Sequence, residues 1–219
     1  LSFLSYRLDN FFLNTFRGPG DVGIYAVAVG LGERLWLPAE ALSTALFPRI
    51  ASYHDQQEKR KIITPMMLRF VMAVSIPVTL LVGLLAHWFV PLLYGEEFSA
   101  SVLPLYALLP GILVFNIGKI LANDLAGRGR VDINLWITGI GTALNIGANL
   151  ILIPRFGAVG AAAASAISYS TVAGLFIFRY TQITGTRLHE LLIFKRSDWV
   201  LVKRAILQAR TRKWSLKNF

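Results

Sequence analysis

The chain contains no cysteine and few charged residues. The absence of cysteine in 219 residues excludes disulfide bonds, thiolate metal sites and cysteine nucleophiles. Charged residues make up 16% of the chain, whereas soluble domains carry about 25%. Hydrophobic residues reach 55%, and a soluble fold of this length could not bury so much apolar surface, because the buried fraction rises slowly with length. The composition predicts a protein whose solvent is lipid.

The sequence also lacks the residue patterns of an enzyme. It has no Ser/His/Asp set, no His-rich metal cluster and no glycine-rich phosphate loop. The Gly-Arg-Gly-Arg turn at 127–130 follows no strand, so it does not indicate nucleotide binding. The sequence therefore predicts no catalytic residues, no cofactor and no metal site.

No signal peptide precedes the apolar residues, and the first residue is Leu1 rather than Met. We therefore expect the chain to be the carboxyl-terminal portion of a longer protein.

Long apolar segments predict an all-α fold, an integral membrane bundle of about six transmembrane helices. A spanning helix needs about 20 mostly apolar residues. Four segments meet this requirement without a charge, at 70–95, 98–118, 133–154 and 156–178. Two more, at about 1–16 and 22–51, carry charged residues. Glycine and proline turns separate most of these segments, as expected at helix ends.

The net charge of +10 is concentrated at the carboxyl end. Residues 184–219 hold nine Lys and Arg against two acids, which predicts a basic cytoplasmic tail after a transmembrane lobe at 1–183. A basic end on an apolar chain favours membrane lipids as partners and not nucleic acid. Lys and Arg also dominate one set of loops, which should be cytoplasmic. This orientation predicts a multi-pass protein of the cell (inner) membrane with both ends in the cytoplasm.

Polar residues inside these helices are the candidate functional residues, because a charge at the bilayer centre costs about 2.5–3.5 kcal/mol. Arg7, Asn10 and Asn14 share one face of the first helix, while Asp9 points elsewhere. This face either lines a central cavity, or the Arg7 side chain extends along the helix to the lipid headgroups. Both interpretations stay open.

The second and fourth helices carry further charges. Glu33 and Glu40 lie two turns apart, with Arg34 adjacent. Two interpretations stay open for these acids. Either they couple transport to protons or Na⁺, or Glu33 forms a structural ion pair. On the fourth helix, Lys119 shares a face with Asn116 and Asn123, and Asp124 follows.

For Lys119 we weigh a phosphate contact against a pair with Asp124 or with a glutamate of the second helix. Asn145 and Asn149, one turn apart, are expected to bond a neighbouring helix in preference to a sugar. Small residues at 139, 143 and 147, and at 160, 164 and 168, predict close helix contacts.

Short motifs in a fixed order carry a family resemblance. They are residues 6–9 (YRLD), 18–25 (GPGDVGIY), 42–50 (LSTALFPRI), 93–98 (LYGEEF), 126–130 (AGRGR), 144–150 (LNIGANL), 154–157 (PRFG) and 160–161 (GA). Together they resemble the polysaccharide-biosynthesis flippases of the multidrug/oligosaccharidyl-lipid/polysaccharide exporter superfamily. The resemblance covers nearly the whole chain except the basic tail.

The resemblance implies two six-helix lobes facing each other, with this chain as the second lobe and an amino-terminal lobe as its missing partner. It implies alternating access and a polyprenyl-diphosphate-linked oligosaccharide as cargo, for cell-surface polysaccharide synthesis. Cations would meet the diphosphate. The expected substrate-binding residues are Arg7, Asn10, Asn14, Arg34, Lys119 and Asn123, and the expected ion-coupling residues are Glu33, Glu40 and Asp9.

Three other functions are compatible with the residues. A multidrug or small-molecule exporter of the same superfamily would have the same fold and a less cationic cavity. A membrane enzyme of glycan assembly would need reactive residues on sizeable outer loops, and these loops are short. A lipid scaffold would tolerate loss of its buried charges.

Overall fold

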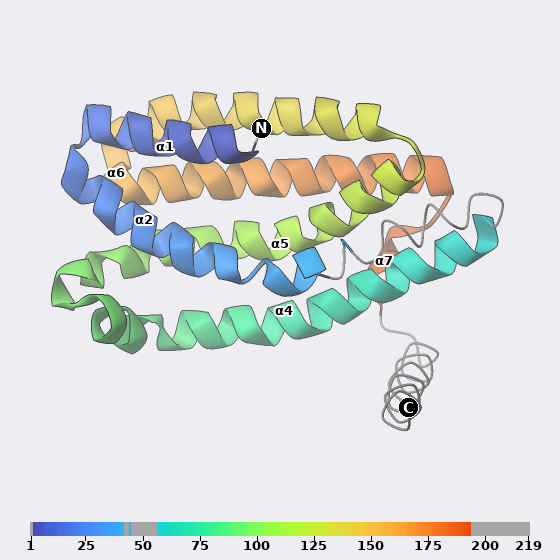
Figure 1. The fold of residues 1–219 in the computed structure, drawn as a ribbon, viewed down its shortest axis with the longest axis horizontal. Coiled ribbons are helices and arrows are strands. Elements are labelled where there is room, and N and C mark those ends of the chain that lie inside the picture. The colour runs from blue at the N-terminus through green and yellow to red at the C-terminus, as the bar shows by residue number, and fades with distance from the viewer. Residues whose placement is uncertain (1, 42–43, 45–56, 194–219) are drawn as a thin grey trace, which may run out of the picture.

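The structure is a computed structural model that describes residues 2–41, 44 and 57–193. Its helices are α1 (Ser2–Phe16), α2 (Pro19–Arg34), α4 (Gln57–Tyr94), the 3₁₀ helix η1 (Glu96–Ser101), α5 (Val102–Gly127), α6 (Val131–Thr184) and the short α7 (Leu188–Leu192). The described residues include no strand. Figure 1 shows the long helices lying roughly along one axis, with most turns at the two ends of the bundle. The all-α prediction is confirmed.

Three stretches are long and apolar enough to cross a membrane, at Ile62–Tyr94, Glu96–Gly127 and Val131–Thr184. The last contains 54 residues, far more than the roughly 20 that one crossing requires. The number of crossings, about six, stays a prediction.

Helix α6 is two helices joined at Gly157, which has φ 56° and ψ −133°. Figure 1 shows the chain reversing direction, so that the yellow and orange halves of α6 run back along each other. The Asp21 carboxylate accepts a hydrogen bond of 3.3 Å from the Ala158 amide, at the start of the second half. The predicted break at 154–157 is therefore confirmed, and its glycine adopts a left-handed backbone that other residues avoid.

Two helix boundaries differ from the sequence prediction. The predicted helix at 22–51 is interrupted at Leu35 and Trp36, before residues 37–41 become helical again. Pro38 explains the interruption, because a proline lacks the amide hydrogen and clashes with the carbonyl four residues earlier. The third predicted helix, expected from residue 70, already begins at Gln57. Its first turns are polar, so apolar content alone does not mark a helix that continues beyond the membrane.

Helix α5 packs closely against the second half of α6 through small residues. A Cβ added to Gly111 would lie 2.5 Å from the Ala166 Cα, and one added to Gly118 would lie 3.2 Å from the Ala173 Cα. The predicted stripe at 160, 164 and 168 is buried. The stripe at 139, 143 and 147 makes no such contact within the described chain, because a Cβ at Gly139 or Gly147 would meet open space.

The exterior of the bundle is apolar and its interior contains polar side chains. Leu92 is 83% exposed and Trp136 is 74% exposed, whereas Asp9, Asn116, Asp124, Asn145 and Asn149 are all buried. Apolar residues also form most of the core. The exposed apolar surface together with the buried polar groups suits a bundle surrounded by lipid.

Candidate functional site

The buried carboxylate of Asp9 is the centre of a hydrogen-bond network between three helices. Asp9, on α1, is 3% exposed. Its Oδ2 accepts hydrogen bonds from the Tyr25 hydroxyl of α2 at 2.9 Å and from the Ser165 hydroxyl of α6 at 3.1 Å. Its Oδ1 accepts a hydrogen bond from the side-chain amide of Asn149, also on α6. Residues up to 156 positions apart in sequence thus meet at one carboxylate.

The reversal of α6 at Gly157 places the two halves of this network opposite each other. Asn145 and Asn149 lie one turn apart in the first half, and the Asn149 amide donates to Asn145 Oδ1 at 3.2 Å. Asn145 in turn donates to Ser165 Oγ, in the second half, at 3.3 Å. The expected bonding of these asparagines to a neighbouring helix is confirmed, and their partners include Asp9.

The network is rich in oxygen, and no described basic side chain forms an ion pair with Asp9. Asn149 Oδ1 is buried and accepts no hydrogen bond, which leaves a free oxygen lone pair beside the Asp9 carboxylate. Such oxygens suit a proton or an alkali cation, because hard cations prefer oxygen ligands. Among the described residues, no group of three or more His, Cys, Asp or Glu could hold a metal ion.

A cavity of about 260 Å³ extends from this network between α2, α5 and both halves of α6. Asp9, Asn145 and Ser165 line one part of it. Its other lining residues are Glu33, Trp36, Phe115, Gly118, Lys119, Ala122, Asn134, Thr138, Gly141, Thr142, Ser168, Tyr169, Val172 and Phe176. The predicted candidates Asp9, Glu33 and Lys119 therefore share one cavity.

Lys119 is held by a carboxylate and an aromatic ring. Its ammonium lies 2.8 Å from Glu40 Oε2 and 4.5 Å from the centre of the Trp36 ring. Of the alternatives for Lys119, a pair with a glutamate that follows α2 is confirmed. Glu33 also lines the cavity, and no described cation forms an ion pair with it.

Four other predicted residues, Asn10, Asn14, Arg34 and Asn123, do not line the cavity. Asn14 and Arg34 are exposed, and Arg34 donates to the Gly30 carbonyl at 2.9 Å. Asn10 is half-buried, with an unpaired buried Oδ1, and Asn123 donates to the Lys119 carbonyl at 3.0 Å. The side chain of Arg7 lies outside the described part of the structure. The roles predicted for these residues in substrate binding stay predictions.

Sequence reasoning missed Tyr25 and Ser165. Hydroxyl groups are common in helices, and nothing in the sequence around them indicates that they contact Asp9. Asn145 and Asn149 were noticed, because two amides one turn apart in an apolar helix are unusual. The contact of Asn149 with a carboxylate 140 positions away had no local signal.

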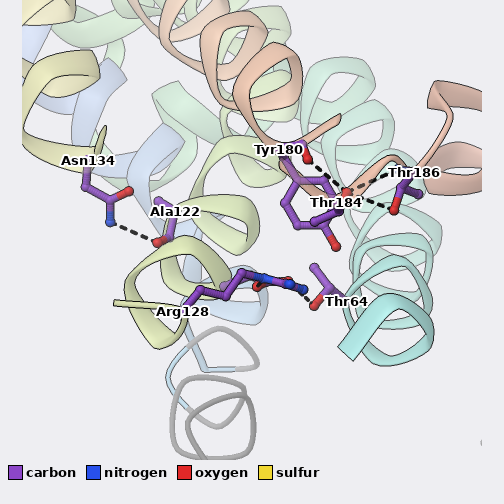
Figure 2. A network of polar contacts seen from close by, with 8 residues as sticks. Thr64, Ala122, Arg128, Asn134, Tyr180, Thr184 and Thr186 are labelled. Atoms are coloured by element: carbon purple, nitrogen blue, oxygen red, sulfur yellow. Dashed lines mark hydrogen bonds and ion pairs between the residues drawn. The ribbon is translucent and has the colours of Figure 1, made fainter. Parts of the chain in front are cut away.

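A second polar cluster closes the end of the bundle near the 127–130 turn. It consists of Thr64, Asp124, Arg128 and Tyr180, and we call it the end cluster. The fully buried Asp124 accepts hydrogen bonds from Thr64 and from the Arg128 guanidinium, which lies 5.7 Å from the centre of the Tyr180 ring. Figure 2 shows the Arg128 side chain reaching towards Thr64 of α4, with the ring of Tyr180 of α6 above them. The cluster thus joins three helices.

Replacing Asp124 by asparagine should destabilise the bundle, because Arg128 would keep its charge without a counter-ion. We expect the free energy of unfolding to fall by about 2 kcal/mol. This is less than the loss expected if the whole Asp124 side chain were removed, because the amide oxygen of asparagine still accepts hydrogen bonds. Denaturant unfolding in detergent would measure this. Asp132→Asn removes an exposed pair with Arg130 and is the control; an equal loss in both variants would contradict the prediction.

An apolar surface, helices long enough to cross a membrane and a buried polar cavity define this chain as an integral membrane protein with a polar interior. A family model described as "Lipid II flippase MurJ" matches residues 37–211. The chain belongs to this flippase family.

Two of the relatives described next are named for glycan or lipopolysaccharide biosynthesis, and the third is named only as a membrane protein. The chain is 25% identical over 170 residues to the "Probable low-salt glycan biosynthesis flippase Agl15" of Haloferax volcanii, covering 74% of this chain and 35% of that protein. It is 28% identical over 162 residues to the "Lipopolysaccharide biosynthesis protein WzxC" of Escherichia coli, covering 73% and 33%. An "Uncharacterized membrane protein MJ1068" of Methanocaldococcus jannaschii is 28% identical over 200 residues, covering 89% and 38%.

These findings confirm the resemblance to oligosaccharide flippases that the sequence motifs indicated. The matched regions span 33% to 38% of the lengths of these three relatives. No solved structure matches the chain significantly.

Proposed function

We propose that this chain is the second lobe of a membrane flippase that translocates a polyprenyl-diphosphate-linked oligosaccharide for cell-surface polysaccharide synthesis. The proposal rests above all on the family match over residues 37–211. The buried polar cavity supports it, because polar groups inside a membrane bundle usually mark a transport path. Alternating access of two facing lobes moves the cargo, and the amino-terminal lobe is the partner of this one.

The proposed lobe has six crossings. They are α1, α2 with the residues that follow it, α4, α5 and the two halves of α6, which the reversal at Gly157 supports. Residues 1–183 form the lobe and 184–219 the basic tail. Both ends of the chain lie in the cytoplasm and the bundle in the cell membrane, as the Lys and Arg of the loops favour.

In this proposal Asp9 is the principal ion-coupling residue. Asp9 holds the coupling ion, a proton or Na⁺, while Tyr25, Ser165 and Asn149 fix the orientation of its carboxylate. The bound ion supplies the positive charge that a buried carboxylate otherwise lacks. Because the network joins α1 and α2 to both halves of α6, ion binding changes the packing between these helices and couples to the movement of the lobe.

Glu33, Glu40 and Lys119 form a second group of charges along the same path. Glu33 lies in the cavity and is available to a coupling ion, whereas Glu40 is paired with Lys119. We propose that the diphosphate of the cargo takes Lys119 from Glu40, because a phosphate is a stronger partner for an ammonium than one exposed carboxylate. Arg7, Arg34, Asn10, Asn14 and Asn123 are proposed to contact cargo in the assembled protein.

A reconstitution experiment tests the proposal. The protein that contains this chain, encoded together with any lobe found by reading the DNA upstream of Leu1, is placed in proteoliposomes with a fluorescent polyprenyl-diphosphate oligosaccharide. We expect translocation driven by a proton or Na⁺ gradient, detected by quenching of the lipid in the outer leaflet. Efflux of a dye without translocation of the glycolipid would instead indicate a small-molecule exporter, and neither activity would contradict both functions.

A further inference from the structure

The cavity has two chemically different parts. Around Asp9 the polar neighbours are hydroxyl and amide groups. The lining also contains the aromatic rings of Trp36, Phe115 and Tyr169, of which Tyr169 neighbours Asp9 and Ser165 as well as Glu33. Oxygen ligands suit a proton or a bare metal ion, whereas ring faces attract organic cations. The aromatic residues of the lining therefore suit an organic cation better than a bare ion, and they need their own explanation.

The three rings form one continuous wall. The ring centres of Trp36 and Phe115 are 5.4 Å apart, those of Trp36 and Tyr169 are 5.4 Å apart, and those of Phe115 and Tyr169 are 4.8 Å apart. These residues come from the segment after α2, from α5 and from the second half of α6. Packing between three segments fixes the ring positions, so the wall is formed in advance of any ligand.

An ammonium group already occupies the face of this wall. The Lys119 ammonium lies 4.5 Å from the centre of the Trp36 ring and 2.8 Å from the Glu40 carboxylate. A ring face on one side and a carboxylate on the other are the two features that stabilise an organic cation. The Lys119 side chain is 20% exposed and that of Glu40 is 63% exposed, so solvent weakens this pair, and another cation can displace it.

Glu33 provides a second carboxylate in the same cavity. Lys119 attracts this carboxylate electrostatically, but among the described residues the close ion pair of Lys119 is with Glu40. A half-buried carboxylate beside aromatic rings is poorly solvated and gains from a cation that brings its own apolar groups.

We propose that the ring-lined part of the cavity binds a small organic ammonium ion, with Glu33 as its counter-ion and Lys119 as a tethered competitor. The whole cavity, including its Asp9 end, has a volume of about 260 Å³, which is below the range of roughly 300–1,000 Å³ for drug-sized ligands. The part beside the rings is smaller still, which favours an ammonium of a few carbon atoms. Two sources carry this chemistry, a free amine or quaternary ammonium in water and the headgroup of a zwitterionic phospholipid. This proposal goes beyond the flippase function, and it gives Glu33 and Lys119 a role in addition to the ion and cargo contacts proposed above.

Choline binding tests the inference. The 219-residue chain is placed in nanodiscs of phosphatidylglycerol, and binding of radiolabelled choline is measured by equilibrium dialysis. We expect saturable binding that Glu33→Gln weakens about thirtyfold or more, because a partly desolvated charge partner is lost. Trp36→Leu should weaken binding about tenfold through loss of the ring face. Lys119→Gln should strengthen it, because the tethered competitor is removed.

Matched controls separate the site from the general surface. Glu97→Gln removes an exposed acid in η1, and Trp136→Leu removes an exposed indole of α6. Neither should change choline binding.

Thermal unfolding of each variant checks that it is folded. If Glu33→Gln is unfolded, Glu33→Asp, which keeps the charge, takes its place and should retain binding. Absence of saturable binding to both the original chain and Lys119→Gln would overturn the proposal, as would equal binding by Glu33→Gln.

Two further arms identify the source and separate this inference from the flippase function. Nanodiscs containing phosphatidylcholine should lower the affinity for free choline if the lipid headgroup occupies the site, and should leave it unchanged if the natural ligand is a free cation. Asp9→Asn should keep choline binding while it removes ion-driven flipping. Choline binding without flipping would leave the ammonium site standing alone, and flipping without choline binding would overturn only the ammonium site.

Discussion

Replacing Asp9 by asparagine is expected to abolish ion-driven flipping in the full protein while the bundle remains folded. Asparagine has nearly the same size as aspartate, but it carries no charge and cannot exchange a proton or hold an alkali ion electrostatically. The hydroxyls of Tyr25 and Ser165 can still donate to its amide oxygen, so most of the network can persist. We expect flipping to fall to the protein-free background and to lose its dependence on the gradient.

The measurement is glycolipid translocation in proteoliposomes with and without an imposed proton or Na⁺ gradient. Asp132→Asn is the control, because Asp132 is an exposed carboxylate of the same helix bundle that pairs with Arg130 on the surface. Asp9→Glu serves as a second variant, since it restores the charge with altered geometry. Flipping by Asp9→Asn that still follows the ion gradient would show that the coupling residue lies elsewhere.

Replacing Gly157 by valine should have the largest effect on stability. The residue has φ 56°, and an added Cβ would lie 2.2 Å from Asp21 Oδ2. We expect the free energy of unfolding to fall by about 4 kcal/mol, since the left-handed backbone cost and the cost of overpacking combine. A valine would also favour one continuous helix in place of the reversal, and would separate Asn149 from Ser165.

Thermal unfolding in detergent, together with the yield of monodisperse protein, measures this effect. Gly174→Val is the matched control, because Gly174 lies in the same helix, has an ordinary helical backbone and has open space around its Cβ position. A lowered unfolding midpoint is expected for Gly157→Val alone. Similar midpoints for both variants would indicate that the reversal does not depend on glycine.

Much of the fold follows from local chemistry. The turns at 17–21, 95–97, 127–130 and 154–157 each contain glycine, and all of them separate helices or half-helices in the structure. The break at Leu35 escaped prediction, because apolar residues continue through it and the responsible proline follows three positions later. The polar start of α4 was also not predicted, because a helix that extends into water has no apolar residues to mark it.

The candidate site was less predictable than the fold. The cost of a charge in lipid singled out Glu33 and Lys119 as candidates, and both line the cavity. Helical periodicity assigned Asp9 to a different face from Asn10 and Asn14, without indicating what that face meets. The meeting of Asp9 with Asn149 and Ser165 depends on how α1 packs against both halves of α6, which is tertiary information that a single sequence does not contain.

The order of synthesis gives the Asp9 network a consequence for assembly. Asp9 is made near the beginning of this chain, and Asn149 and Ser165 are made 140 and 156 residues later. Until α6 is made, α1 carries a carboxylate without these donors. If α1 crosses the membrane as we propose, its insertion without them is disfavoured by about 2.5–3.5 kcal/mol, and the last long described helix completes the environment that Asp9 requires.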